Sequence, residues 1–304
     1  MGDEGSNYMT SFKRVSEICF SRIYKVLLWP DWIFKFTPTY RDMKFHTKVM
    51  RKFLTKIMDQ KKLQYLNGNK EESKVKKKAL IDVLLQQHFE NQVLKDEDIR
   101  EDIDVLIIGG HETTATIVAW TLFLLGLYPD IQKQVHEELD KVFGEDVERY
   151  ASESDLSDLK YLDCVLKETQ RLYPAASFWA REVSEDINIC GYTLPKGSSF
   201  VLPAMILHRD PEVFPDPDKF DPDRFSAENS VNIPEYAYIP FSVGPRNCIG
   251  QRFGVLEMKT IVSTILRSYR VESLDGRDVV LPVMQGFLRS SVPIRVRIRP
   301  RKSQ

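Results

Sequence analysis

The sequence carries almost no net charge and few cysteines. Basic and acidic residues number 43 and 44 and leave a net charge of −1 over 304 residues, so no general positive field exists to attract DNA or RNA. We therefore expect no nucleic-acid partner. The cysteines form no C-x-x-C pair, which argues against a zinc site or a disulfide framework and favours a reducing compartment; they are Cys19, Cys164, Cys190 and Cys248.

The first residues lack the basic stretch and apolar run of a secretory signal peptide, and no anchor helix is expected among them. Residues 6–66 instead show apolar positions at helical spacing. The period breaks at 27–34, where a proline lies among aromatic residues, so two helices around an aromatic corner are predicted. The stretch 61–78 is rich in lysine and glutamate and has little to bury, which predicts a solvated loop and not a basic binding patch.

The longest helical pattern covers residues 96–127. Acidic residues lie in its first turns, where the helix dipole favours them, and Pro129 follows its end. Because Val105 to Tyr128 is mostly apolar, a transmembrane helix is the alternative interpretation. Glu112 lies near the middle of this segment, and a central carboxylate costs about 3 kcal/mol on membrane insertion. A buried core helix is therefore the favoured prediction.

The rest of the chain predicts a mainly α fold with a minor β-sheet, and 304 residues allow one large or two ordinary domains. A proline-rich stretch without strands covers 211–240, and the tail alternates apolar residues around Pro293, as in an edge strand. The remaining predicted elements are helices at 130–142, at 159–172 and from about Ile249 to Arg267, with short β-like runs between 180 and 202.

One short segment combines a cysteine with glycines just before a predicted helix. It reads Phe241-Ser242-Val243-Gly244-Pro245-Arg246-Asn247-Cys248-Ile249-Gly250. A helix start stabilises a thiolate at Cys248, and Gly244 and Gly250 allow the backbone to approach a flat macrocycle closely. Arg246 can bind a propionate, and Phe241 can screen the sulfur from water. The alternative is a structural cysteine in a turn, but five such residues in a fixed frame arise by chance on the order of once in 10⁴ sequences.

This segment resembles the cysteine loop of the cytochrome P450 family, whose haem iron is bound by a cysteine thiolate. The resemblance implies a single domain over residues 1–304 with the family's fold, in its C-terminal portion: a long central distal helix, then the cysteine loop followed by the proximal helix. It also implies haem b as the cofactor, with Cys248 as the metal ligand.

A second motif, Gly109-Gly110-His111-Glu112-Thr113-Thr114, falls inside the long helix. Two glycines cost a helix about 2 kcal/mol against alanine, so they predict a local widening; a crossing point between packed helices is the alternative. The resemblance implies that Glu112 and Thr113 deliver protons during dioxygen chemistry. Gly109 stands where one branch of the family often has a glutamate that esterifies the haem, so here the haem is expected to be non-covalent apart from the iron–sulfur bond.

Glu168 and Arg171 match the Glu-x-x-Arg pair of the family, and Arg224 resembles the third member of its buried ionic network. The spacing alone has no meaning, since Glu97 and Arg100 share it and are expected to form a surface pair. The resemblance makes Arg181 a second propionate ligand. His208 also lies in a matching motif, but we expect it to form structural hydrogen bonds and not to ligate iron.

The likeness is greatest to the fatty-acid-hydroxylating branch of animal microsomal enzymes, which resembles family 4. It implies a monooxygenase that inserts one oxygen atom of O2 into a fatty acid or similar lipophile, with electrons from NADPH through a reductase, at the cytoplasmic face of the endoplasmic reticulum membrane. A haem-thiolate lyase or isomerase is disfavoured because such relatives tend to lack the Glu112–Thr113 pair. Substrate identity and the carbon that is oxidised are not encoded in any motif.

Met1-Gly2-Asp3 resembles an internal stretch of the family, so the membrane anchor and the first helices are expected to be missing. A non-catalytic truncated product with impaired haem binding is therefore the alternative function.

Four aromatic residues lie at the predicted corner in the first part of the chain. Their side chains are expected to contact a membrane surface, to line the substrate entrance, or to belong to an ordinary core. They are Trp29, Trp32, Phe34 and Phe36.

Overall fold

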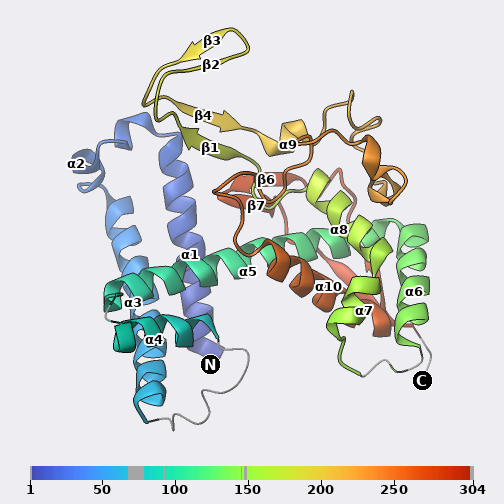
Figure 1. The fold of residues 1–304 in the computed structure, drawn as a ribbon, viewed down its shortest axis with the longest axis horizontal. Helices are drawn as coiled ribbons and strands as arrows, with labels where there is room; N and C mark the ends of the chain where they lie inside the picture. The colour runs from blue at the N-terminus through green and yellow to red at the C-terminus, as the bar shows by residue number, and fades with distance from the viewer. Residues whose placement is uncertain (1, 68–78, 92, 145, 147–148, 302–304) are drawn as a thin grey trace. The chain divides into compact units, whose positions relative to one another are not determined.

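The structure is a computed structural model that describes residues 2–67, 79–91, 93–144, 146 and 149–301. The chain divides into two compact units, residues 1–109 and 110–304, which are described separately (Figure 1). The boundary between them falls inside the longest helix. The expected single domain over the whole chain stays a prediction.

The first unit is built around two long helices, α1 (Gly2–Ile23) and α3 (Pro38–Asn67), which pack against each other (Figure 1). Between them lie η1 (Val26–Leu28) and α2 (Asp31–Phe34), so the prediction of two helices around an aromatic corner is confirmed. One guanidinium holds this corner, because Arg22 donates to the backbone oxygens of Leu28 and Trp29 and lies 4.4 Å from the Phe34 ring centre.

The predicted solvated loop at 61–78 is wrong in its first part. Helix α3 continues through residues 61–67. Lys61 pairs with Asp82 at 3.6 Å, and Lys62 pairs with Asp96 at 2.5 Å, so these polar residues have partners within the first unit. Residues 68–78 lie outside the described residues. The helix α4 (Leu80–Asn91) follows.

Helix α5 (Asp96–Leu127) has the bounds that the sequence predicted. It is α-helical at every residue, including Gly109 and Gly110. The local widening predicted at this glycine pair is therefore not found as a break in the α-helix. By length and composition it could cross a membrane, which is weak evidence for a span because core helices of soluble proteins meet the same criterion. Only 28% of its apolar window is buried inside the structure, so the predicted buried core helix is buried in part.

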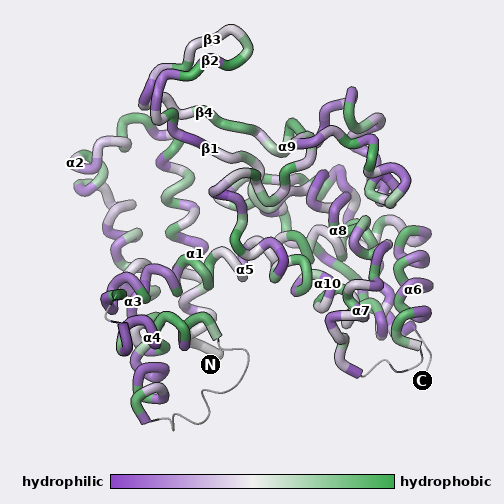
Figure 2. The backbone as a smooth tube through the Cα atoms, in the orientation of Figure 1, coloured by the Kyte–Doolittle hydropathy of each residue, from purple (hydrophilic) through white to green (hydrophobic). Residues whose placement is uncertain are grey.

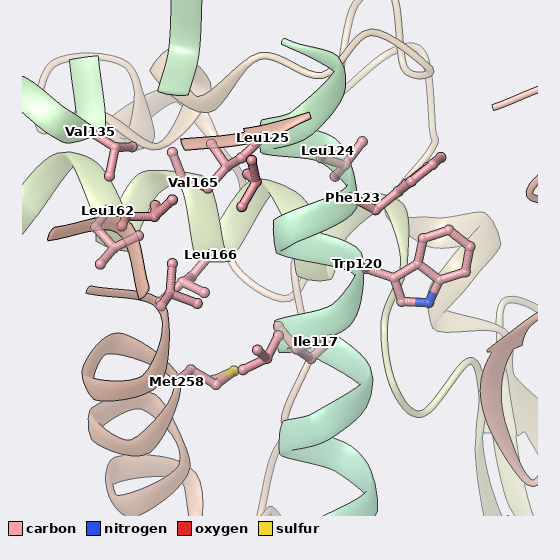
Figure 3. Packing of buried hydrophobic residues seen from close by; sticks show 14 of the residues in the cluster. Ile117, Trp120, Phe123, Leu124, Leu125, Val135, Leu162, Val165, Leu166 and Met258 are labelled. Carbon is pink, nitrogen blue, oxygen red and sulfur yellow. The ribbon is translucent and has the colours of Figure 1, made fainter. Parts of the chain in front are cut away.

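The core of the second unit lies among the end of α5 and four further helices: α6 (Pro129–Phe143), α7 (Glu153–Asp158), α8 (Lys160–Leu172) and α10 (Gln251–Ser268). In Figure 3, Ile117 of α5 and Met258 of α10 point toward each other, and Leu162 and Leu166 extend from α8 into the same cluster. Hydrophobic and hydrophilic residues alternate along α6, as Figure 2 shows, because one face of this helix is buried. The predicted helices at 130–142, 159–172 and 249–267 are confirmed to within three residues.

The strands of the second unit form antiparallel pairs, which confirms the mainly α fold with minor β structure. The pairs are β1 (Trp179–Glu182) with β4 (Ser199–Leu202), β2 (Ile187–Ile189) with β3 (Tyr192–Leu194), β5 (Tyr269–Ser273) with β8 (Val296–Pro300), and β6 (Pro282–Gln285) with β7 (Phe287–Ser290). The predicted edge strand in the tail is shorter than expected: β8 begins after Pro293, whose missing N–H cannot join a ladder.

Between β4 and α10 the chain has little regular structure, as the proline content predicted. The elements in this stretch are a one-turn helix, α9 (Ala204–Leu207), and the 3₁₀ turns η3 (Pro222–Phe225) and η4 (Ser230–Asn232). Its apolar residues still pack, because Phe214 and Phe225 are buried beside Cys164 of α8.

Candidate functional site

The cysteine loop is a closed backbone turn that ends at the start of α10. The Cys248 N–H donates to the Phe241 oxygen at 2.9 Å, and the Asn247 N–H donates to the Gly244 oxygen at 3.1 Å. Gly244 adopts a φ of +81°, in the left-handed region that a side chain disfavours. Backbone hydrogen bonds within the loop therefore hold the cysteine backbone in place.

The Cys248 thiol is exposed three residues before the first residue of α10. Among the residues that the structure describes, no side chain caps this helix start and no acid lies in its first turn. The positive end of its helix dipole can therefore stabilise an anionic sulfur.

Haem needs a soft iron ligand, apolar contact for the macrocycle and cations for its two propionates. Beside the thiol, Ile249 and Phe253 are 95% and 70% exposed, although both are large and apolar. Arg181 of β1 reaches the cysteine loop, because its Nη2 donates to the Ser242 Oγ at 3.0 Å, and Arg246 is exposed within the loop.

Open space adjoins these residues. A Cβ built on Gly110, Gly244 or Gly254 would have no described atom within 4 Å, and one built on Gly250 would meet only the Cys248 Sγ, at 4.0 Å. The donor set and the space fit haem: a single sulfur for iron, exposed apolar side chains and two guanidinium groups.

The acid–threonine turn of α5 is connected to two other elements. The Glu112 Oε1 accepts from the Arg289 Nη2 of β7 at 3.1 Å. The Thr114 hydroxyl donates to the Glu257 Oε2 of α10 at 3.1 Å. Thr113 is half-buried between these two contacts. Helix α5 and the helix that follows the cysteine loop are thus joined at Thr114, directly after the predicted proton-delivery residues Glu112 and Thr113.

Arg289 and Glu257 were missed by the sequence analysis. They lie 177 and 143 residues from their partners, and neither belongs to a motif with recognisable spacing. The hydrophobic alternation of the tail indicated a strand near Arg289, but nothing in it indicated a partner for Glu112.

The three residues of the predicted ionic network lie together. Arg171 donates to both carboxylate oxygens of Glu168 at 2.7 and 2.8 Å, and both side chains are fully buried. The Arg224 Nε lies 3.6 Å from the Glu168 Oε1. Burial raises the pKa of Glu168, against the opposing effect of the Arg171 guanidinium. Such a network fixes geometry more than it adds stability, because desolvating its charges is costly.

The comparison pair with the same spacing behaves differently. Glu97 and Arg100 are in contact at 2.8 Å but lie at the surface of the first unit. Identical i, i+3 spacing therefore gives a solvated pair in α5 and a buried pair in α8, and the tertiary environment decides which one forms.

His208 has a structural role in this part of the protein. Its Nε2 accepts from the Ile239 N–H at 2.9 Å, two residues before the cysteine loop, and its side chain is fully buried. Burial, and secondarily the Arg171 guanidinium, lower the pKa of His208 to about 4. The neutral ring is thus a hydrogen-bond acceptor that supports the approach to the loop.

An exposed thiol at an uncapped helix start, with two guanidinium groups on or at the same loop, fits a cysteine-ligated haem. The sequence model of the Cytochrome P450 family matches residues 1–298, and the chain belongs to this family. The cofactor of the family is haem b with a cysteine–iron bond.

The chain is similar to family 4 members, which confirms the resemblance found in the sequence. It is 39% identical to "Cytochrome P450 4c3" of Drosophila melanogaster, over 97% of the chain and 58% of that relative. It is 40% identical to human "Cytochrome P450 4V2", over 99% of the chain and 59% of that relative. For "Cytochrome P450 4c21" of Blattella germanica the identity is 38%, over 91% and 56%. The chain thus spans less than two thirds of the length of these relatives.

Proposed function

We propose that this protein is a haem-thiolate monooxygenase, an oxidoreductase that inserts one oxygen atom of O2 into an apolar substrate. The observation that carries the proposal is the exposed Cys248 thiol at the uncapped start of α10, on the helix that Thr114 joins to the acid–threonine turn. The thiol at the helix start can hold a thiolate-ligated cofactor, and the acid–threonine turn can hold and pass protons.

When bound, haem supplies dioxygen binding and oxidising power. Cys248 would bind its iron through the sulfur, with the α10 helix start stabilising the negative charge. Phe241, whose oxygen accepts from the Cys248 N–H, would limit water access to the sulfur. Arg181 and Arg246 would bind the propionates through charge-assisted hydrogen bonds.

Glu112 and Thr113 would hold and transfer protons at the site. A carboxylate held by one cation can accept a proton from solvent and pass it on over hydrogen-bond distance. The adjacent threonine hydroxyl can donate and accept at once, so it can relay that proton without a change of charge.

The substrate and partners follow from the likeness to family 4 and from the surface of the first unit. The proposed substrate is a fatty acid or similar lipophile, and the proposed electron donor is an NADPH-dependent reductase at the cytoplasmic face of the endoplasmic reticulum membrane. Trp32 and Phe36 are 69% and 82% exposed at the aromatic corner, and Trp29 is exposed beside them, whereas Phe34 is buried. Exposed aromatic side chains in one place favour contact with a membrane surface.

Spectroscopy of the haem-loaded chain tests the proposal. Reduced protein treated with carbon monoxide should show the Soret band of a thiolate-ligated haem, and Cys248→Ser should abolish it. NADPH-dependent substrate oxidation in the presence of reductase should accompany the band. An absent band, or one at the histidine-ligated position, would instead support a non-catalytic product with impaired haem binding, and turnover without reductase would support a lyase or isomerase.

A further inference from the structure

The turn of α5 that contains Thr113 is held on both sides by side chains from distant elements. Glu112 contacts Arg289 of β7, and Thr114 contacts Glu257 of α10. The resemblance assigns roles to Glu112 and Thr113 but none to Arg289. Of these contacts, the one with Arg289 involves the acid itself, so it can determine where the carboxylate lies.

Arg289 comes from a backbone that is firmly attached to the core. It lies opposite Val283 in the β6–β7 hairpin, whose turn is made by Gly286 at a φ of +96°. The preceding residue, Leu288, is buried, and its N–H donates to the Ala175 oxygen at 2.9 Å. The backbone of Arg289 is therefore held in place, and the Arg289 guanidinium can hold a partner side chain in a defined position.

The Glu112–Arg289 pair is also shielded from water. The two side chains are 12% and 21% exposed, whereas the surface pair of Glu272 and Arg297 is 52% and 50% exposed. Exposed pairs contribute little because water competes and the side chains must be ordered. A shielded, charge-assisted hydrogen bond is stronger and restricts the torsions of the glutamate.

We propose that Arg289 is a positioning residue that holds the Glu112 carboxylate in place for proton delivery at the haem site. The inference rests on the proposed function, in which Glu112 handles protons. Proton transfer needs donor and acceptor within hydrogen-bond reach, and a misplacement of about 1 Å can lower a rate on the order of a hundredfold. A glutamate that samples several rotamers would rarely meet this requirement.

The first experiment measures the pair itself, independently of turnover. Wild type, Glu112→Gln, Arg289→Gln and the double variant of the haem-loaded chain are unfolded in urea. The two substitutions should be non-additive, with a coupling of roughly fivefold or more in the unfolding equilibrium constant. Additive effects would overturn the proposal. Arg297→Gln, at the exposed pair, is the matched control and should change this constant by less than about twofold.

The second experiment separates positioning from a merely structural role. With reductase, NADPH and dodecanoate, Arg289→Gln should lower kcat by roughly tenfold to a hundredfold and lower product formed per NADPH consumed, with KM within about twofold. Arg289→Lys, which keeps one charged donor, should recover part of both, and it serves as the test variant if Arg289→Gln does not fold. Equal kcat and product yield in wild type and the arginine variants would refute the role.

Failure of the positioning role can be told apart from failure of the proposed function. A wild-type chain that lacks the thiolate Soret band would overturn the proposed function and, with it, this role, even if the stability cycle shows coupling. A wild-type chain with the band and turnover, combined with unchanged kcat in Arg289→Gln and Arg289→Lys, would overturn the role of Arg289 alone.

Discussion

Acid should destabilise this protein through His208. The ring is fully buried, and its Nε2 accepts from the Ile239 N–H. Protonation would place a second N–H against that donor and a cation near Arg171. These effects lower the pKa of His208 from its ordinary 6.5 to about 4, with burial as the larger cause. The folded protein therefore resists a proton that the unfolded chain accepts.

The sign and size follow from this difference. Between about pH 6.5 and pH 4 the unfolded chain binds a proton at this position and the folded protein does not, so stability falls as the pH falls. One pKa unit corresponds to about 1.4 kcal/mol, so the full loss from His208 is about 3 kcal/mol by pH 4. Burial also lowers the pKa of His136 to about 4, and that residue adds a loss of similar size over the same range.

The assay is urea unfolding followed by tryptophan fluorescence at several pH values, with the buried Trp120 as a reporter of the core. His208→Gln places an amide oxygen near the former Nε2 and cannot titrate. Its free energy of unfolding should fall by about 3 kcal/mol less than that of wild type between pH 7 and pH 4. His111→Gln, at an exposed position, is the matched control and should follow wild type. Parallel curves for wild type and His208→Gln would refute the reasoning.

Three further predictions test other parts of the structure. Glu168→Gln leaves a buried guanidinium without its counter-ion and should lower the free energy of unfolding by about 3 to 5 kcal/mol in urea titrations. The control Glu97→Gln, at the surface, should change it by less than about 0.5 kcal/mol. Equal effects of the two substitutions would contradict the assigned burial. Gly126→Ala places a Cβ 2.6 Å from a backbone nitrogen of β5 and should cost about 1 to 3 kcal/mol, seen as a lower Tm; an unchanged Tm would count against this packing. Trp32→Ser with Phe36→Ser should weaken sedimentation with phosphatidylcholine vesicles by roughly tenfold or more, since each aromatic contributes about 1.5 kcal/mol or more when buried; unchanged binding would exclude the corner as a membrane contact.

Local signals explain what the sequence could predict. Helix α5 has the predicted bounds because acids mark its start and Pro129 follows its end. The cysteine loop was recognised because glycine, arginine and cysteine must stand at fixed places in one short segment to surround a haem ligand. The α3 helix was predicted too short, since its last residues are polar and gain their partners from Asp82 and Asp96, which lie beyond the predicted loop.

The rest depends on contacts between distant residues. Arg289 and Glu257 face the acid–threonine turn only after the chain has folded, and their identities carry no periodicity that would have indicated this. The difference between Glu97 and Glu168 is likewise a matter of environment, because both begin the same i, i+3 pattern. At Gly109 and Gly110, where a widening was predicted, α5 stays α-helical, because a long helix can accommodate two glycines at a modest cost in free energy.

Arg171 organises a part of the chain that has little secondary structure. Its five N–H groups are all used: two bind Glu168, and three bind the backbone oxygens of His208, Pro217 and Lys219. The planar Arg171 guanidinium on α8 thus binds backbone oxygens of the irregular stretch that leads to Cys248. In a β-sheet, such oxygens would be paired by a neighbouring strand. Lysine has the same charge but only three donors on a single nitrogen, so it could not span these acceptors. Replacing Arg171 with lysine would therefore change the backbone conformation around His208, Pro217 and Lys219, dozens of residues further along the chain.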